Sequence, residues 1–223
     1  MKATLLSLAL CFIAVLTSAN STTNTQDTAV FAAIKGSYTS IFKDKNTGWY
    51  LVEKNHKWGY VDTNGDLVVE PRYERACGFH ENLAAVQRNG RWGWINMSGE
   101  EVIAPMYENA SSFKNGVAIA EFAGKWGWID NKGATVVPFV YDWVMDFRND
   151  GRAAVKQDNK WGWIDREGKI IIPIQFDRVD GYEEGLVRVS KGSNTFYIDR
   201  NGRCVEDCYH ERDNYNSTAS VGH

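Results

Sequence analysis

Apolar positions along the chain alternate with polar ones, and the alternation returns at a fixed interval. Two apolar positions lie eight and six residues before each of four tryptophans, for example Ala84 and Val86 before Trp92. A separation of two residues is the strand period, so each pair predicts a strand with one constant buried face. The four tryptophans follow one another at steps of 34, 34 and 35 residues and are Trp58, Trp92, Trp126 and Trp161.

Each of these tryptophans opens a second predicted strand, in which a glycine separates two aromatic residues. Trp92 and Trp94 share one side of this strand, whereas Ile95 points to the other side. Because both sides are apolar, the strand is expected in the middle of a packed array. The glycine weakens the strand, so we expect a neighbouring backbone or ring against it. The residues expected to serve packing are Trp58, Gly59, Trp92, Gly93, Trp126, Gly127, Trp161 and Gly162.

A hairpin turn and a third strand complete the predicted unit. In the first copy the turn runs from Asp62 to Gly65, with the chemistry of a type I turn that ends in a left-handed glycine. The pair Val68 and Val69 predicts the third strand, and Pro71 is predicted to end its pairing because proline has no N–H to donate. A turn-capping role is favoured over metal binding or acid–base chemistry for Asp62, Asn96, Asp130, Asp165 and Asp199.

The fixed period predicts an all-β fold, a tandem array of three-stranded antiparallel units of about 34 residues. Four complete units are expected between partial ones. Residues 38–57 match only the back half of a unit, and the last copy, with Thr195 and Phe196 in place of Trp-Gly, is interpreted as a C-terminal cap. An open solenoid-like array is favoured, because propeller blades have a longer period of about 40–45 residues. Propeller-like closure is the alternative, with the two partial ends completing a ring.

The repeated phrase is Lys/Arg-Trp-Gly-Trp/Tyr-Ile/Val-Asp/Asn-x-x-Gly, followed by an aliphatic pair, proline and an aromatic residue. This phrase resembles the WG-repeat (KWG-repeat) family from about Gly36 to Arg203. The resemblance implies a β-rich repeat module used for binding or display. It carries no catalytic residues over to this chain.

The first 19 residues are typical of a secretory signal peptide, with Lys2 before an apolar run and small residues before the predicted cleavage near Ala19. The run of about 14 apolar residues is shorter than the ~20 that span a bilayer, so no membrane span is expected in the mature chain. We therefore expect a secreted or periplasmic protein. Residues 20–35 are predicted to be a flexible leader, 36–203 the repeat domain and 204–223 a mostly disordered polar tail.

Charge and side-chain chemistry narrow the function. The net charge of -3 and the pI near 5.8 give no basic field, so nucleic acid is not an expected partner. No Ser/His/Asp or Cys/His constellation stands out, and neither an enzyme nor a cofactor is expected. A hydrolase with an unrecognised site is the remaining enzymatic alternative. Cys204 and Cys208 are candidates for a disulfide, with free thiols or a zinc site that includes His210 as alternatives.

Two tryptophans lie outside the repeated columns and are weak candidates for ligand contact, Trp49 and Trp143. The favoured function is an exported, non-catalytic scaffold that binds a protein partner. The alternative is a module that binds cell-wall or surface glycans through these two rings, since aromatic faces pack on sugar C–H groups and on cations.

Overall fold

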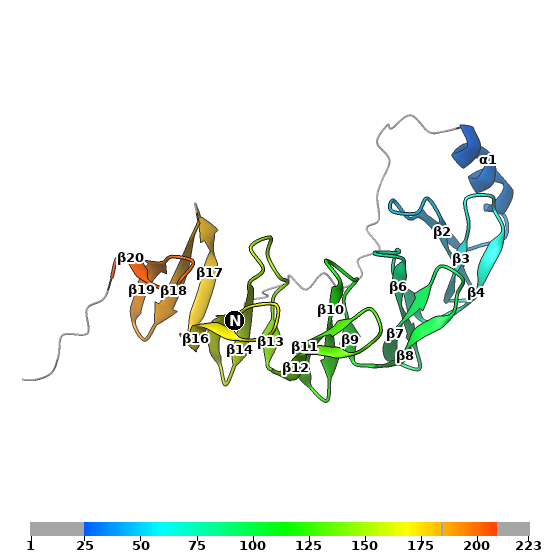
Figure 1. Ribbon diagram of the computed structural model, residues 1–223. Coiled ribbons are helices and arrows are strands. Elements are labelled where there is room, and N and C mark those ends of the chain that lie inside the picture. The colour runs from blue at the N-terminus through cyan, green and yellow to red at the C-terminus, as the bar shows by residue number, and fades with distance from the viewer. Residues whose placement is uncertain (1–24, 184, 209–223) are drawn as a thin grey trace, which may run out of the picture.

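The computed structural model describes residues 25–183 and 185–208, which form one helix and five four-stranded antiparallel sheets in sequence order. The signal-like segment 1–19, leader residues 20–24 and tail residues 209–223 lie outside this range. The sheets follow one another in a curved row (Figure 1). The fold is therefore all-β with tandem repeats, as the sequence predicts.

The first sheet contains β1 (Ser40–Lys43), β2 (Tyr50–Lys54), β3 (Lys57–Val61) and β4 (Leu67–Tyr73). The second contains β5 (Arg75–Ala76), β6 (Leu83–Arg88), β7 (Arg91–Asn96) and β8 (Glu101–Tyr107), and the third β9 (Asn109–Ala110), β10 (Val117–Phe122), β11 (Lys125–Asp130) and β12 (Thr135–Tyr141). The fourth contains β13 (Trp143–Val144), β14 (Ala153–Gln157), β15 (Lys160–Ile164) and β16 (Ile170–Phe176), and the fifth β17 (Arg178–Glu183), β18 (Leu186–Lys191), β19 (Asn194–Ile198) and β20 (Cys204–Glu206).

The number of strands per unit differs from the prediction of three. The additional strand is the first of each sheet, and in the three central sheets it has only two residues, too few to show a period. This strand also completes the first sheet. Residues 38–57 hold β1 and β2, so the array begins with a full sheet and not with half a unit.

The core is a series of layers between neighbouring sheets. Trp92 and Trp94 of the second sheet pack against Ala118, Ala120 and Ile129 of the third. The large tryptophans of one sheet thus meet small and aliphatic residues of the next, which is the interlocking that dense packing requires. Each internal sheet is buried on both faces, as its doubly apolar strands predict.

The glycine of each Trp-Gly phrase lies under a bulge in the edge strand. Trp58 pairs with Tyr73 and Tyr60 pairs with Val69, so residues 70–72 all face Gly59. A Cβ at Gly59 would lie 2.3 Å from the Val69 carbonyl oxygen, which confirms the predicted close approach of a neighbouring backbone.

The prolines do not end the edge strands, so that prediction is wrong. Pro71 lies inside β4, within the bulge, and pairing resumes at Tyr73. Its missing N–H is harmless there because a bulged residue has no ladder partner. Proline on an edge strand also hinders pairing with another chain. The equivalent prolines lie inside the edge strands β8, β12 and β16 and are Pro105, Pro138 and Pro173.

The predicted flexible leader is corrected for residues 25–34, which form helix α1 (Thr25–Ile34). Val30 and Ile34 are one turn apart and pack against Tyr50, Val52 and Val61 of the first sheet. Among the described residues no earlier sheet covers this face, and the helix takes the place of such a neighbour. Repeat arrays need such a terminal cap.

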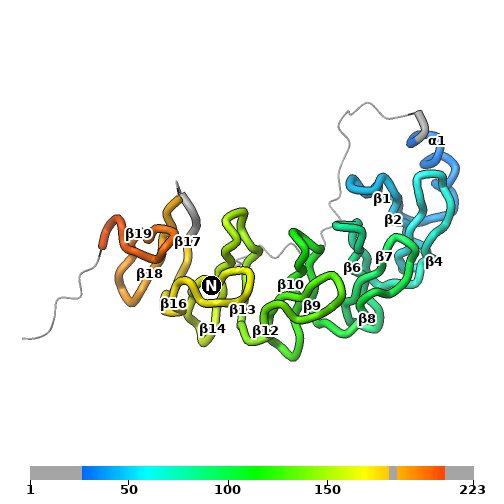
Figure 2. The backbone as a smooth tube through the Cα atoms, viewed as in Figure 1, coloured from blue at the N-terminus to red at the C-terminus, as the bar shows by residue number. Residues whose placement is uncertain are grey.

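The row of sheets is open. The first and fifth sheets lie at its two opposite ends (Figures 1 and 2). The fifth sheet carries Arg188, Thr195 and Glu206 on its outer face, and all three are exposed. The second sheet has Ala85, Trp92 and Ile103 at the same repeat positions. These polar replacements end the stacking, so the favoured open array describes the fold and propeller-like closure does not.

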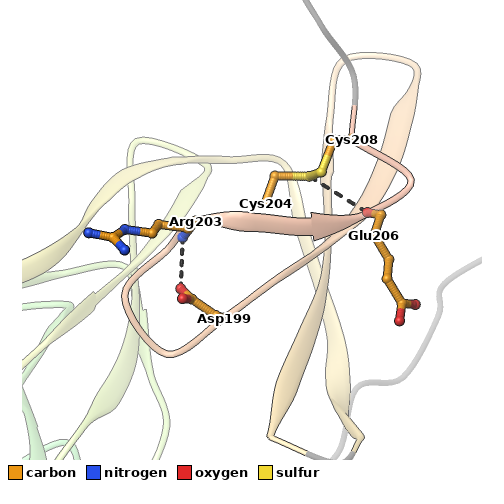
Figure 3. The surroundings of a disulfide bond; sticks show 5 residues. All are labelled: Asp199, Arg203, Cys204, Glu206 and Cys208. Atoms are coloured by element: carbon orange, nitrogen blue, oxygen red, sulfur yellow. Dashed lines mark hydrogen bonds between the residues drawn. A yellow bond between two sulfur atoms is a disulfide. The ribbon is translucent and has the colours of Figure 1, made fainter.

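A disulfide closes a short loop at the last strand of the array. Cys204, the first residue of β20, is bonded to Cys208, two residues beyond the end of β20, with the Cα atoms 5.6 Å apart (Figure 3). The preceding turn is held by Asp199, whose carboxylate accepts the Arg203 N–H at 2.9 Å. The expected polar tail therefore begins with an ordered strand. The sulfur atoms are joined, so in this form they offer no thiolates to zinc, and His210 lies outside the described residues.

Candidate interaction surface

Four carboxylates lie on the links between sheets. Each accepts from a cationic side chain of the preceding sheet and from a backbone N–H of the next sheet, so each connects two sheets. Lys125, in the third sheet, donates to Asp142 Oδ1 at 2.6 Å. The backbone N–H groups of Asp158 and Asn159, in the fourth sheet, donate to the same carboxylate. The hydrogen bond from Lys125 is the main cause that lowers the pKa of Asp142, and it raises the pKa of Lys125. We call these contacts acid latches; the pairs are Lys57–Glu74, Arg91–Glu108, Lys125–Asp142 and Lys160–Asp177.

The acidic column of the turns serves the backbone. Asp130 Oδ1 accepts the N–H groups of Lys132 at 2.9 Å and Ala134 at 2.8 Å. The other four members accept the two equivalent N–H groups of their own turns. The predicted turn-capping role is therefore confirmed for the whole column. Within residues 25–183 and 185–208, no group of three or more His, Cys, Asp or Glu residues is placed to hold a metal ion.

A hollow of about 350 Å³ that is open to solvent is lined by Arg148, Asn149 and Asp150, so it holds a single carboxylate. A second hollow lies beside Trp128, Ser111 and Phe147, and its volume is about 10 Å³. Such a space holds about one water molecule at most. It is far smaller than the ~300 Å³ at which ligand pockets begin.

The two candidate ligand tryptophans are both half-buried. Trp49 meets Phe79 of the second sheet edge-on, with ring centroids 5.3 Å apart. Trp143 of the fourth sheet lies against Trp126 of the third, with centroids 5.5 Å apart. Each ring thus packs across a boundary between sheets, and the two rings lie at different boundaries.

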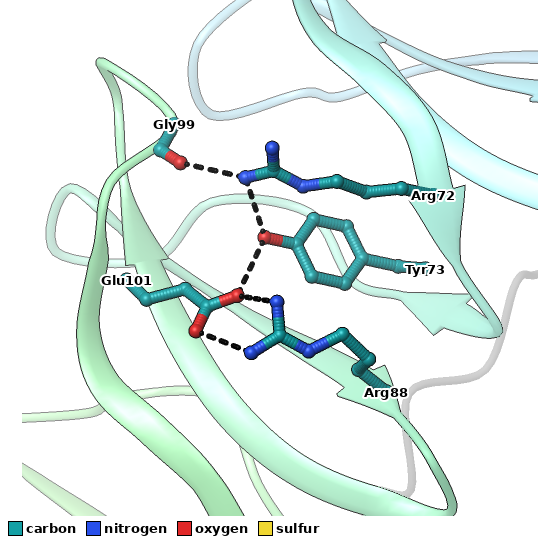
Figure 4. A network of polar contacts seen from close by, with 5 residues as sticks. All are labelled: Arg72, Tyr73, Arg88, Gly99 and Glu101. Carbon is teal, nitrogen blue, oxygen red and sulfur yellow. Dashed lines mark hydrogen bonds and ion pairs between the residues drawn. The ribbon is translucent and has the colours of Figure 1, made fainter.

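The outer rim of the first boundary carries a polar network (Figure 4). Arg72 lies over the ring of Tyr73, 5.1 Å from its centroid, and donates to the Tyr73 hydroxyl at 3.0 Å and to the Gly99 carbonyl at 3.2 Å. Arg88 forms a two-point ion pair with Glu101, with contacts of 2.6 and 2.8 Å. We call the exposed edge of a boundary between two neighbouring sheets a seam. Seam 1 lies between the first and second sheets, and seam 4 between the fourth and fifth.

At the next two seams, two of the three positions of this network are apolar. At seam 2 the positions of Arg72, Arg88 and Glu101 are taken by Met106, Phe122 and Thr135, and at seam 3 by Val140, Gln157 and Ile170. Phe122 and Phe139 of the third sheet cluster with Tyr107 of the second, with centroids 5.9 to 6.2 Å apart. At seam 4 two of the positions are polar again, and Lys191 donates to the Gln175 side chain at 3.2 Å. The third position is the disulfide-bonded Cys204.

We call the apolar residues of seams 2 and 3 the seam patch: Met106, Phe122, Phe139, Val140 and Ile170. Four of them are 42 to 52 % exposed, and Phe139 is partly buried. Four members hold the repeat positions of Arg72, Arg88 or Glu101, which are neighbours at seam 1 (Figure 4). The fifth, Phe139, lies against Phe122, with ring centroids 5.9 Å apart. Large exposed apolar patches commonly mark interaction sites. Sequence reasoning missed it, although comparing the copies would have shown columns that change from charged to apolar.

Comparison with known proteins agrees with this architecture. A family model described as "WG containing repeat" matches residues 58–92, 92–126, 126–161 and 161–194. This chain belongs to the WG-containing repeat family. No curated protein sequence matches it. The WG-containing repeats begin at the first tryptophan of each phrase, so every family unit crosses a boundary between two sheets.

Several solved structures align with these WG-containing repeats at low sequence identity. A crystal structure of the eukaryotic initiation factor aligns with a TM-score of 0.50 at 10 % identity, covering 79 % of this chain and 55 % of that chain. PorZ, a surface component of the type-IX secretion system of Porphyromonas gingivalis, aligns at 0.36 and 8 % identity over 75 % of this chain and 26 % of that one. The N-terminal domain of Nup159 aligns at 0.41 and 9 % identity over 75 % and 60 %. The aligned part of this chain thus spans about half of the initiation factor.

Proposed function

We propose that this protein is an exported, non-catalytic repeat module that binds a protein partner through the seam patch. The observation that carries the proposal is the exposure of four large apolar side chains at positions where seam 1 has an ion-paired network. Exposing such side chains costs solvation free energy, so a partner that covers them gains about 25 cal/mol per Å². The repeated aromatic residues, by contrast, are occupied by packing.

Export is supported by two features of the chain. The first 19 residues have the charge, the apolar run and the small residues of a signal peptide. The disulfide between Cys204 and Cys208 suits an oxidising compartment outside the cytosol. Among the described residues, no helix is both long and apolar enough to cross a membrane.

The glycan alternative has less support from the geometry. It relied on Trp49 and Trp143, and both rings pack against an aromatic residue of another sheet. A sugar platform needs a free ring face. We therefore propose the protein-binding role in preference to it.

A triple variant tests the proposal. In Met106→Gln, Phe122→Gln and Val140→Gln combined, each new side chain is the one that another copy holds at that position, Gln175 or Gln157. The fold should therefore tolerate it. Chemical cross-linking to extracytoplasmic proteins of the source, followed by peptide mapping, is expected to place wild-type cross-links beside the patch. The triple variant should lose them.

The matched control is Leu67→Thr, which removes an apolar side chain of similar exposure, 41 %, outside the patch. It introduces the residue that the third sheet has at this position, Thr135. The control should keep the cross-links. Cross-links that map away from the patch, or that survive in the triple variant, would contradict the proposed function.

A further inference from the structure

The size of the seam patch limits what can bind to it. Four half-exposed side chains and Phe139 present on the order of 300 Å² of apolar surface. A standard protein–protein interface needs about 800 Å² from each partner. A second copy of the chain would therefore find too little surface here, whereas a short peptide segment is of the right size.

The seams on either side of the patch each supply a cation without a carboxylate partner. Arg72 at seam 1 donates only to the Tyr73 hydroxyl and the Gly99 carbonyl. Lys191 at seam 4 donates only to the Gln175 side chain. All three acceptors are neutral, so neither cation forms an ion pair of its own among the described residues. The Tyr73 hydroxyl links Arg72 to Glu101 at 3.4 Å, but Glu101 is already paired with Arg88, so seam 1 holds two arginines for one carboxylate.

The carboxylates nearest the patch are already engaged. Glu108 accepts from Arg91 and from the Gly124 N–H, and Asp142 accepts from Lys125. Glu121 accepts the side-chain amide of Asn109. None of these three acids forms a hydrogen bond or ion pair with Arg72 or Lys191 among the described residues. The surface is therefore apolar in its centre and positive at its two ends.

The distance between the two cations sets the length of a ligand. Sheets that pack face to face lie about 10 Å apart, so three steps from seam 1 to seam 4 cover about 30 Å. An extended chain rises about 3.3 Å per residue, and about nine residues span that distance. The segment would run across the edge strands, whose prolines disfavour pairing along them. Side chains, not backbone ladders, would carry its recognition.

We infer that the seam patch binds an extended peptide segment of about nine residues, with an aromatic or aliphatic centre and a carboxylate side chain at each end. This inference rests on the proposed function and names the chemistry of the partner. The apolar centre covers the patch, one terminal carboxylate meets the Arg72 guanidinium, and the other meets the Lys191 ammonium. Met106 and the phenylalanine rings suit varied centres because methionine adapts its shape and contacts aromatic rings favourably.

The test is selection from a displayed library of random 12-residue peptides. Four proteins are used: the wild type, the triple glutamine variant, Leu67→Thr, and the double variant Arg72→Gln with Lys191→Gln. Glutamine keeps a hydrogen-bond donor at both positions and removes the charge. Melting temperatures and near-ultraviolet circular dichroism verify that all four are folded.

Wild type and Leu67→Thr are expected to enrich peptides with an apolar centre and Asp or Glu towards both ends. The double variant should keep the apolar centre and lose the acidic preference. A selected peptide synthesised for titration should bind the double variant about three- to tenfold more weakly than the wild type, and neutralising its own carboxylates should abolish that difference. The triple variant should enrich neither peptides with an apolar centre nor peptides with acidic ends.

The outcomes separate the two proposals. Loss of enrichment in the triple variant, with unchanged acidic preference in the double variant, overturns the charge pattern and leaves the protein-binding role standing. Equal enrichment by the triple variant and the wild type overturns both. Sedimentation with phosphatidylserine–phosphatidylcholine vesicles is the third arm. Vesicle binding that is lost in the triple variant, without any peptide enrichment, would assign the patch to a membrane surface and overturn the peptide proposal.

Discussion

At the scale of single residues, the glycine of the Trp-Gly phrase is explained by a close contact between its strand and the backbone of the edge strand. The glycine is required because the bulged edge strand occupies the space of its Cβ. In the third sheet, a Cβ at Gly127 would lie 2.6 Å from the Val137 carbonyl oxygen. Real Cβ atoms do not come so close to a backbone oxygen, and β11 cannot move away from β12 without straining its ladder with β10 on the other side.

Gly127→Ala is therefore expected to destabilise the protein by about 3 kcal/mol, the upper range for overpacking a core. Urea unfolding followed by tryptophan fluorescence measures it. Gly36→Ala is the matched control, because nothing lies within 4 Å of a Cβ at Gly36 and its backbone is not left-handed. The control should change stability by less than about 0.5 kcal/mol. Equal costs for the two substitutions would show that the edge strand does not constrain Gly127.

Sequence reasoning predicted the role of this glycine but assigned the nearby proline wrongly. The glycine could be predicted because an unfavourable residue between two aromatic ones requires a spatial reason. Pro71 was taken as an end of pairing because its missing N–H is visible in the sequence. The bulge that makes the missing N–H harmless is a property of two paired strands, and no single strand reveals it.

At the scale of elements, the acid latches connect each sheet to the next through the links. The spacing between the cation and the acid is 17 residues in all four copies, as in Lys57 and Glu74. Its constancy is a signal that the sequence contains. A charged residue on a link is ordinarily read as solvated, so the latches emerge only when the next hairpin turn is seen against the carboxylate.

The latches make stability sensitive to acid. The pKa values of Glu74 and Glu108 are lowered chiefly by the N–H groups of Gly90 and Gly124, and that of Asp177 chiefly by Lys160. A carboxyl with a lowered folded-state pKa stabilises the fold fully above its ordinary value, 4.5 for Glu and 3.8 for Asp. That contribution is lost as pH falls through the lowered value.

The melting temperature is thus expected to fall more steeply below pH 4.5 in the wild type than in a variant with all four latch acids changed to amides. The variant should be less stable at neutral pH, and the difference should shrink as pH falls. Thermal unfolding between pH 7 and 3 checks this. Parallel curves would mean that the latches do not contribute to stability.

At the scale of the whole molecule, we expect the stability to be the sum of contributions from each sheet and from its contacts with the neighbouring sheets. Each sheet is covered by the sheet on either side, and only the two ends need a different solution. Helix α1 covers the exposed face of the first sheet with Val30 and Ile34. The outer face of the fifth sheet is polar, and its last strand carries the disulfide. The helix was missed because its first four residues are polar and residues 29–34 are all apolar, so its sequence lacks the one-sided period of an amphipathic helix.

Ile34→Ala is expected to cost about 2 kcal/mol, and the loss should stay within the first sheet. Hydrogen exchange measures this locally. Protection should fall in β2 and β3 and remain in β10 and β11. Phe31→Ala is the control on the same helix, since Phe31 is 44 % exposed and should leave exchange nearly unchanged. A loss of protection spread over all five sheets would contradict nearest-neighbour stacking.

The overall architecture was accessible from sequence because its determinants recur, whereas the seam patch was not. Positions that hold the same type of residue in every copy could be assigned to the core. Positions whose residue type varies between copies, such as those of the seam patch, gave no such signal. Met106 and Arg72 are equivalent in the repeat and opposite in character. Their significance depends on exposure and on the polar partners of Arg72, which require coordinates.

The acid latches also affect how such a repeat protein can gain units by gene duplication. Each latch uses a cation from one sheet and a turn from the next, and every internal sheet presents the same two halves. Duplicating the third sheet in the gene would therefore insert a unit that closes with both neighbours and leaves helix α1 and the disulfide in place. It would also repeat Phe122 and Phe139 along the rim. The seam patch can therefore lengthen by one repeat at a time while the fold stays intact.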